Sequence, residues 1–286
     1  MFKPKSILIS ALLAVISCSI SIRAINSGLI DGVVYIVGTG KASIPTSLLS
    51  NLKENAYLIA SSFKSYNIIV SVEGNSYSGF TSWSNEDRQV TIVKDDFTSP
   101  SKTVRLAHCR NMLLDTVRDA SNLVISDNDM LVVMDFDEVN SQQFSHSTLS
   151  AALALSSSWD VLSFNRIYYY DIWSLRYDRF NINSWNFGMQ SRVLRDIIEA
   201  DLTSLLDPID THLLPVYSAY NGLAMYRLGH TEGCYYSGTN LESFAKNTVY
   251  NHTRLSISED CEHVAFHKCL REKHSSRIVI YSGIIS

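Results

Sequence analysis

Apolar and polar positions along the chain form blocks that predict strands separated by helices. Short apolar runs rich in β-branched residues have the length of buried strands, and longer segments repeat apolar positions every three or four residues, as amphipathic helices do. The expected strands are 33–37, 67–72 and 90–93, and the expected helices are 47–63 and 104–120. This alternation favours an α/β fold. We expect one domain over 26–286 with a Rossmann-like, mostly parallel central sheet flanked by helices.

The most informative block is residues 130–138, Met-Leu-Val-Val-Met-Asp-Phe-Asp-Glu. Five apolar residues in a row predict a strand that is buried on both faces, and acidic residues follow where the sheet ends. Asp135 and Asp137 are two apart on an extended segment, so both side chains point the same way. Two carboxylates on one side can bind Mn²⁺ or Mg²⁺ together with phosphate oxygens and water. The alternative is a strand end that simply meets solvent.

The second half of the chain continues the alternation but contains more aromatic residues. A helix is expected over 149–157 and a strand over 159–165. Residues 168–176 combine Tyr, Trp, Asp and Arg, a set that suits the apolar face and the hydroxyls of a sugar ring. A structural aromatic cluster explains the same pattern. Residues 215–227 predict an extended element interrupted at Asn221-Gly222, which indicates a turn or a close approach of the backbone.

Two helices carry further candidate side chains. Arg105 and Arg110 lie on the helix before the acidic strand, where arginine suits a diphosphate, or they form a solvated helix face. A second helix is expected from Ser258 to residue 270, with acidic residues in its first turn. Its His263 and His267 are four apart and share one face, as metal ligands do, although Glu and His near the start of a helix are more often solvated or capping residues.

The N-terminus predicts a targeting segment over 1–25. Lys3 and Lys5 precede a long apolar stretch, which is typical of a signal peptide or a signal anchor; a buried first helix is the alternative. The Asn251-His252-Thr253 sequon agrees with a glycosylated lumenal domain. We therefore expect the chain in the secretory pathway, in the ER or Golgi lumen, either cleaved or as a single-pass type II membrane protein.

Composition restricts the function classes. The chain has 286 residues, 46% apolar and 18% charged, with a net charge of -4. This composition supports a folded domain, and without a cluster of basic residues we expect no nucleic-acid partner. Outside the N-terminal stretch, four cysteines permit up to two disulfides whose connectivity stays open: Cys109, Cys234, Cys261 and Cys269.

An ordered set of motifs resembles a known family. The set is Arg-x4-Arg-Asn at 105–111, Val-Val-Met-Asp-Phe-Asp at 132–137, Trp-Asp-Val-Leu-Ser-Phe-Asn at 159–165, Tyr-Tyr-Asp-Ile-Trp-Ser-Leu-Arg at 169–176, Ser-Ala-Tyr-Asn-Gly-Leu-Ala-Met-Tyr at 218–226 and Cys-Glu-His-Val-Ala-Phe-His at 261–267. From residue 33 to the C-terminus the chain resembles GT-A glycosyltransferases with a DxD motif. Within them it is most similar to the fungal capsule-associated α-1,3-mannosyltransferase group and its protist and giant-virus relatives.

The resemblance implies a nucleotide-sugar donor, GDP-mannose first among them, a divalent cation and a glycan acceptor. It implies a cation site at Asp135 and Asp137, with His267 as the candidate for a third ligand. The remaining implied roles are donor contacts at Glu73, Arg105, Arg110, Asn111 and Asp135, sugar or acceptor contacts at Tyr170, Asp171, Trp173, Arg176, Asn221, Gly222 and His263, and catalysis at Asp260 and Glu262.

Two other function classes compete with a glycosyltransferase. A lumenal carbohydrate-binding module would use the same aromatic residues to bind a glycan, and the acidic pair to hold a structural cation. A secreted hydrolase would need paired catalytic carboxylates, but those of glycosidases do not normally lie one residue apart at a strand end. Turnover of a nucleotide sugar separates the transferase from both.

Overall fold

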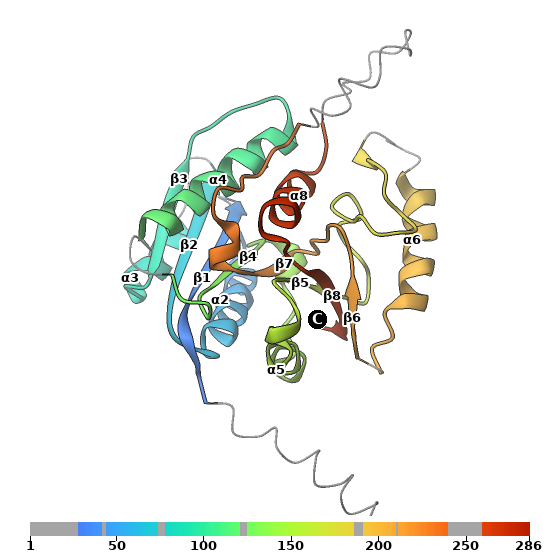
Figure 1. Ribbon diagram of the computed structural model, residues 1–286. Helices are drawn as coiled ribbons and strands as arrows, with labels where there is room; N and C mark the ends of the chain where they lie inside the picture. The colour runs from blue at the N-terminus through green and yellow to red at the C-terminus, as the bar shows by residue number, and fades with distance from the viewer. Residues whose placement is uncertain are drawn as a thin grey trace, which may run out of the picture.

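The computed structural model describes residues 28–41, 44–73, 78–120, 125–185, 191–209, 211–239 and 259–286. Within these ranges the strands form one eight-stranded sheet in the order β3-β2-β1-β4-β7-β5-β8-β6 (Figure 1). The strands are β1 (Ile30–Lys41), β2 (Phe63–Glu73), β3 (Val90–Asp95), β4 (Met130–Met134), β5 (Val161–Asn165), β6 (Leu213–Pro215), β7 (Leu223–Arg227) and β8 (Ile278–Ile284). The helices are α2 (Thr46–Ala60), α3 (Ser78–Glu86), α4 (Lys102–Ala120), α5 (His146–Ala154), α6 (Ser191–Leu205) and α8 (Glu262–His274).

The sheet is mixed, and the expectation of a mostly parallel sheet is wrong. Of the seven neighbouring pairs in the described sheet, four are parallel and three antiparallel. The three antiparallel pairs arise because β7 lies antiparallel between β4 and β5, and because β6 pairs antiparallel with β8 at the edge of the sheet. The α/β class and the four parallel strands β3-β2-β1-β4 are as expected. At the centre, every residue of β4 and β5 is buried.

Helices cover both faces of the sheet. The core on one face combines α4, α6 and α8 with alternate strand residues such as Leu131 and Val133. The core on the other face combines α2, α3 and α5 with the intervening residues such as Val132 and Met134. In Figure 1, α6 stands at the edge of the molecule opposite β3. Because successive residues of a strand point to opposite faces, a continuous apolar run such as β4 serves both cores.

Several elements differ from the sequence expectation. Helix α3 and the strands β6 and β8 were not predicted, and neither was α6. Helix α3 is rich in serine, which has modest helix propensity, but Phe80 and Trp83 are fully buried and anchor it to the sheet. The expected helix at 47–63 ends at Ala60, because Phe63 already begins β2. The last helix begins at Glu262 after Cys261, and Ser258 lies outside the described residues.

A disulfide joins Cys234 to Cys269 on α8. The other two cysteines of the globular part, Cys109 and Cys261, are free and buried. The segment before α8 is thereby tied to that helix.

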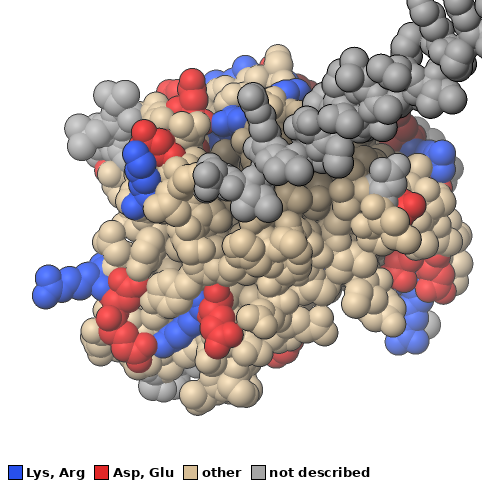
Figure 2. All heavy atoms as spheres, turned by 90° about the horizontal axis from the view of Figure 1, so that it is seen from below, with Lys and Arg blue, Asp and Glu red and all other residues tan. Residues whose placement is uncertain are grey.

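Charged side chains are mixed by sign on the face shown in Figure 2, where basic and acidic groups lie next to each other near the rim around a largely uncharged middle. None of the described helices is both long and apolar enough to cross a membrane. The expected targeting segment at 1–25 and the sequon at Asn251 lie outside the described residues.

Candidate functional site

A cavity of about 230 Å³ opens at the carboxyl ends of β1, β2, β3 and β4; we call it the strand-end pocket. Its lining residues are Thr39, Gly40, Ser71, Asp95, Lys102, Arg105, Leu106, Cys109, Arg110, Asp135, Asp137 and Tyr170. The chain runs from β1 outward to β2 and β3, and then places β4 on the other side of β1. Open α/β sheets bind ligands at such a switch point, beyond the carboxyl ends of the strands.

The acidic pair faces the pocket because the chain stays extended beyond β4. The backbone N–H of Asp135 donates to the Gly222 carbonyl at 2.9 Å, and the backbone N–H of Phe136 donates to the Thr39 carbonyl at 3.0 Å. Phe136 is fully buried and packs edge-on against Trp83, with ring centroids 5.8 Å apart. Its neighbours on either side therefore point the opposite way, and both Asp135 and Asp137 line the pocket.

The turn after the pair is held by local hydrogen bonds. The Asp137 carboxylate accepts from the Val139 N–H at 3.0 Å and caps the short 3-10 helix Glu138–Asn140. The Asn140 side chain donates to the backbone oxygens of Asp135, at 2.7 Å, and Gly222, at 2.8 Å. Gly222 has φ +81°, and a Cβ there would lie 2.3 Å from the Val139 side chain. Asn221-Gly222 is thus a close approach of the backbone, as expected, but it supports the acidic turn.

Arg110 is the ionic centre behind the acidic pair. Its guanidinium is buried, lies 3.1 Å from the Asp135 carboxylate, donates to Glu262 and stacks over the Tyr220 ring. Burial, the largest single effect, lowers the pKa of Arg110, but the Asp135 charge acts together with Tyr220 and other neighbouring groups and holds the pKa above its ordinary value. Glu262 is buried too and is the second counter-charge of Arg110. The structure therefore places Glu262 behind the pocket wall and not at an open acceptor position.

The other expected donor residues divide between the pocket and the scaffold. Arg105 lines the pocket and also donates to the Ser99 carbonyl. The Asn111 amide donates to the Tyr236 carbonyl at 2.9 Å and accepts from its N–H at 2.8 Å, so it anchors that segment and does not line the pocket. Glu73 ends β2 and pairs in register with Lys41 and Asp95; its side chain lies outside the described part.

The aromatic segment reaches the pocket through Tyr170, which is 39% exposed and lines it. The buried Asn221 side chain accepts from the N–H groups of Tyr170, at 2.7 Å, and Asp171, at 3.4 Å, and donates to the Phe164 carbonyl at 3.2 Å. Asn221 thus positions Tyr170 and does not itself face the cavity.

Asp171 and Trp173 lie beside the pocket. Burial, followed by the nearby Asp135 charge, raises the pKa of Asp171 to about 6. Its carboxylate accepts from the backbone N–H groups of Trp173, at 3.2 Å, and Ser174, at 3.3 Å. The Trp173 ring packs edge-on against Trp185 and lies under the Arg195 guanidinium. Neither residue lines the strand-end pocket.

Arg176 and Asp260 form a buried ion pair, with nitrogen and oxygen 2.8 Å apart, away from the strand-end pocket. Their charges compensate each other, so the geometry gives neither residue a catalytic position in that pocket.

The two histidines of α8 are in the core. His267 Nδ1 lies 2.9 Å from the Ser218 hydroxyl and Nε2 lies 3.0 Å from the Tyr226 hydroxyl, so both ring nitrogens are engaged. Burial, with Arg271 second, lowers the pKa of His267 to about 3. His263 is fully buried and its ring stacks on the Tyr220 ring, with the two ring centroids 3.8 Å apart. Burial, followed by the Arg110 charge, lowers the pKa of His263 well below its ordinary value. The structure brings neither histidine to the pocket, and we drop His267 as a candidate third ligand.

The sequence reading missed four residues that belong to the site. Asp95 ends β3, and Lys102 begins α4 at the pocket, where a helix N-terminus also favours anions. Extending the third strand by two residues would have found Asp95.

The other two missed residues are buried. Cys109 lines the pocket, and burial raises the pKa of its thiol to about 12. Buried Arg166 donates to the Asn221 carbonyl at 2.8 Å and the Val139 carbonyl at 3.1 Å, and burial lowers its pKa to about 10.

The acidic pair fits a divalent cation that is bound together with a ligand. The described ranges contain no cluster of three or more His, Cys, Asp and Glu side chains that could hold a metal by themselves. Mg²⁺ and similar ions commonly use one or two carboxylates together with phosphate oxygens and water. Asp135 and Asp137 face one cavity and supply two carboxylates of that kind.

Comparisons with known proteins identify loose structural likenesses. No family model matches the chain, and no curated protein matches it by sequence. Among solved structures, S. aureus TarS 1-349 is 12% identical, covers 89% of this chain and 59% of its own, and has a TM-score of 0.42. The mannosyltransferase PcManGT from Pyrobaculum calidifontis, in complex with GDP-Man and Mn²⁺, is 14% identical, with coverages of 79% and 55% and a TM-score of 0.40. 4-Diphosphocytidyl-2C-methyl-D-erythritol synthase is 10% identical, with coverages of 88% and 90% and a TM-score of 0.41.

This chain spans a little more than half the length of the first two of these structures. Likenesses at this level of identity and superposition do not identify a family.

Proposed function

We propose that this protein is a metal-dependent glycosyltransferase of GT-A type that moves a sugar from a nucleotide-sugar donor to a hydroxyl of a glycan or glycoconjugate. One observation carries the proposal. Two carboxylates, Asp135 and Asp137, face a cavity at the switch point of the sheet, and the same cavity is lined by Lys102 and Arg105. Acidic ligands for a cation beside basic side chains and a helix N-terminus form a combination that suits a nucleoside diphosphate bound with a divalent cation.

The residues of the pocket have distinct parts in this proposal. Asp135 and Asp137 would hold Mn²⁺ or Mg²⁺, which when bound offsets the charge that develops on the leaving diphosphate. Lys102 and Arg105 contact the diphosphate oxygens from the first turns of α4. Arg110 positions Asp135 through their ion pair. Tyr170 supplies an aromatic side at the pocket mouth for the sugar or the nucleotide.

A donor panel with and without metal tests the proposal. The full chain is incubated with nucleotide sugars, GDP-mannose first, in Mn²⁺, Mg²⁺ or EDTA, and release of the nucleoside diphosphate is measured. We expect metal-dependent turnover of one donor and loss of most of it in Asp137→Asn. Asp196→Asn is the matched control, because Asp196 is an exposed aspartate on α6. Full turnover by Asp137→Asn in EDTA would exclude this mechanism, and donor binding without turnover would favour a binding module.

We also propose that the chain enters the secretory pathway. The support is the basic and apolar N-terminal sequence together with the Cys234–Cys269 disulfide, since disulfides persist in oxidising compartments. Expression in a eukaryotic cell, followed by glycosidase digestion, should show a mobility shift that Asn251→Gln abolishes. A protein without N-glycan in the cytosolic fraction would contradict this proposal.

A further inference from the structure

A second and larger cavity, of about 840 Å³, lies along the outer side of α8; we call it the α8 groove. Its lining includes Arg271 and Lys273 of α8, Asn181, Tyr217, and Asp260, which precedes the helix by two residues. No residue of this groove belongs to the strand-end pocket. The start of α8 lies between the two cavities, because Asp260, two residues before the helix, lines the groove, while Glu262, its first residue, contacts Arg110 of the pocket.

Arg271 forms no ion pair with a carboxylate of the described residues. Its guanidinium lies over the Tyr217 ring, 5.1 Å from the centroid. Its Nε is buried without a hydrogen-bond partner, and no ion pair joins Arg271 to any of the described residues. A guanidinium that lies over an aromatic ring has its position restricted by that contact, and its planar fork of donors suits a carboxylate or a phosphate.

The groove as a whole carries an excess of positive charge. Four basic side chains line it against two acidic ones, a balance of +2. Arg176 pairs with Asp260 at 2.8 Å, and Lys268 lies 3.9 Å from Glu272. Arg271 and Lys273 are the two cations of the lining that no described carboxylate neutralises.

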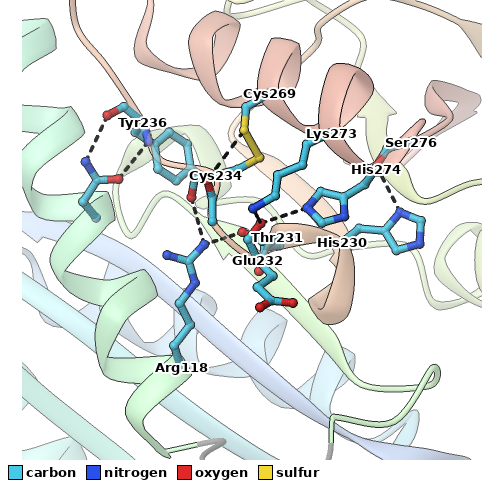
Figure 3. Close-up of a disulfide and its surroundings, with 12 residues drawn as sticks. Arg118, His230, Thr231, Glu232, Cys234, Tyr236, Cys269, Lys273, His274 and Ser276 are labelled. Carbon is cyan, nitrogen blue, oxygen red and sulfur yellow. Dashed lines mark hydrogen bonds between the residues drawn. A yellow bond between two sulfur atoms is a disulfide. The ribbon is translucent and has the colours of Figure 1, made fainter.

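The wall of the groove before α8 is anchored. Figure 3 shows the Cys234–Cys269 disulfide with Lys273, which donates to the Glu232 carbonyl at 3.1 Å. Arg118 of α4 donates to the Cys234 carbonyl at 2.8 Å and also to the Thr231 carbonyl (Figure 3). The disulfide and the Lys273 hydrogen bond therefore tie two lining residues of the groove, Cys269 and Lys273, to the segment before α8, and such restraint lowers the entropy cost of binding.

We propose that the α8 groove binds an anionic saccharide, a glycan that carries carboxylate or phosphate groups, with Arg271 as its anion contact. Asn181 and hydroxyls of the opposite walls supply the neutral polar contacts that sugar hydroxyls use. The volume is in the range of sites for drug-sized ligands, which is the size of a short oligosaccharide. If the proposed transferase activity holds, the α8 groove binds the acceptor glycan on the other side of α8 from the nucleotide-sugar donor. This role as an acceptor site rests on the proposed function, whereas binding of an anionic saccharide in the groove does not.

Calorimetry on the full chain tests the site with trigalacturonate, mannose 6-phosphate, neutral maltotriose and a triglutamate peptide. We expect the charged sugars to bind and the Arg271→Gln variant to lose at least tenfold in affinity, with Arg271→Lys in between. Arg88→Gln is the matched control, since it removes the same charge from an exposed position outside the groove, and it should bind as the wild type does.

Binding of only one of the two charged sugars identifies carboxylate or phosphate as the anion and keeps the proposal. Equal binding of maltotriose, equal binding of triglutamate, no binding of either charged sugar, or equal losses in Arg271→Gln and Arg88→Gln would each overturn it. Donor turnover measured on the same preparations keeps this result separate, because the proposed function fails only if the donor is not turned over.

Discussion

The parallel and the mixed halves of the sheet use their polar residues differently. At the ends of β3 and β4, Asp95, Asp135 and Asp137 line an open cavity. In the half that contains β7, Asn221 and His267 are fully buried and hydrogen-bonded to neighbouring groups. The difference follows from the topology. Parallel strands end together and leave their last side chains facing a crevice, whereas an inserted antiparallel strand brings loops into the interior, where polar side chains must pair with other protein groups.

The largest expected effect concerns Arg110, which joins the two halves through Asp135 and Glu262. Arg110→Met should destabilise the protein by about 3–5 kcal/mol, because it leaves two poorly hydrated carboxylates without their partner. Urea unfolding measures the loss. Lys102→Met, an exposed lysine on the same helix, should change the free energy of unfolding by no more than about 0.5 kcal/mol. Adding Glu262→Met to Arg110→Met should recover part of the loss; equal stabilities of the two single variants would contradict this assignment.

Asn221 tests the scaffold role of the mixed half. Asn221→Ala should cost about 1–3 kcal/mol, because the partly buried N–H of Tyr170 and the buried Phe164 carbonyl lose their partner. Asn128→Ala, at an exposed asparagine, serves as the control in the same denaturation series and should be close to neutral. If both variants are equally stable, Asn221 does not hold the segment that carries Tyr170.

Asp171 lies beside the strand-end pocket, but its carboxylate accepts hydrogen bonds from backbone groups, as Asn221 of the mixed half does. Its titration therefore sharpens the comparison between the two halves. The folded pKa of about 6 exceeds the unfolded value near 4, so the folded state holds this proton more tightly. Its contribution to stability is therefore fully present below about pH 4 and is lost as the pH rises through about 6. Between pH 7 and pH 4 the wild type should gain about 2 kcal/mol relative to Asp171→Asn, measured by urea unfolding at each pH. A difference that does not vary with pH would mean that Asp171 titrates normally.

The smallest expected effect on stability is at Asp137. Asparagine keeps an oxygen that can accept from the Val139 N–H, so Asp137→Asn should alter the free energy of unfolding by less than about 0.5 kcal/mol while it weakens metal-dependent donor binding. Thermal denaturation and calorimetric titration of the donor with Mn²⁺ separate the two quantities. A loss of stability above about 1 kcal/mol would place Asp137 with the structural polar residues of the mixed half.

Much of the parallel half could be predicted from local pattern. Continuous apolar runs identified β1, β2 and β4, and the alternation of two residues placed Asp135 and Asp137 on one side of the chain. The insertion of β7 could not be predicted in this way, because strand order and direction depend on contacts between distant segments. The Leu213–Pro215 strand and α3 are held by packing on the sheet and have weak patterns of their own.

The candidate site was harder to predict where one residue type serves two purposes. Sequence identified Arg110 and Glu262 but not their ion pair, which bridges residues 152 apart in the chain. The spacing of His263 and His267 correctly indicated one helix face, but that face is directed into the core, where Tyr220, Ser218 and Tyr226 surround the rings. A helix face can be inferred from spacing, whereas its neighbours depend on the tertiary fold.

The disulfide beside the α8 groove also makes a covalent ring of the chain from Cys234 to Cys269, a separation of 35 residues. Closing a ring of this size lowers the conformational entropy of the unfolded chain, and in the chain-entropy description this raises the free energy of the unfolded state by about 4 kcal/mol. A single peptide-bond cut inside the ring leaves both pieces of the polypeptide joined. Helix α8 and β8 would then stay attached to the rest of the protein until a reductant opens the bond, so a nicked protein would migrate as one species without reductant and as two fragments with it.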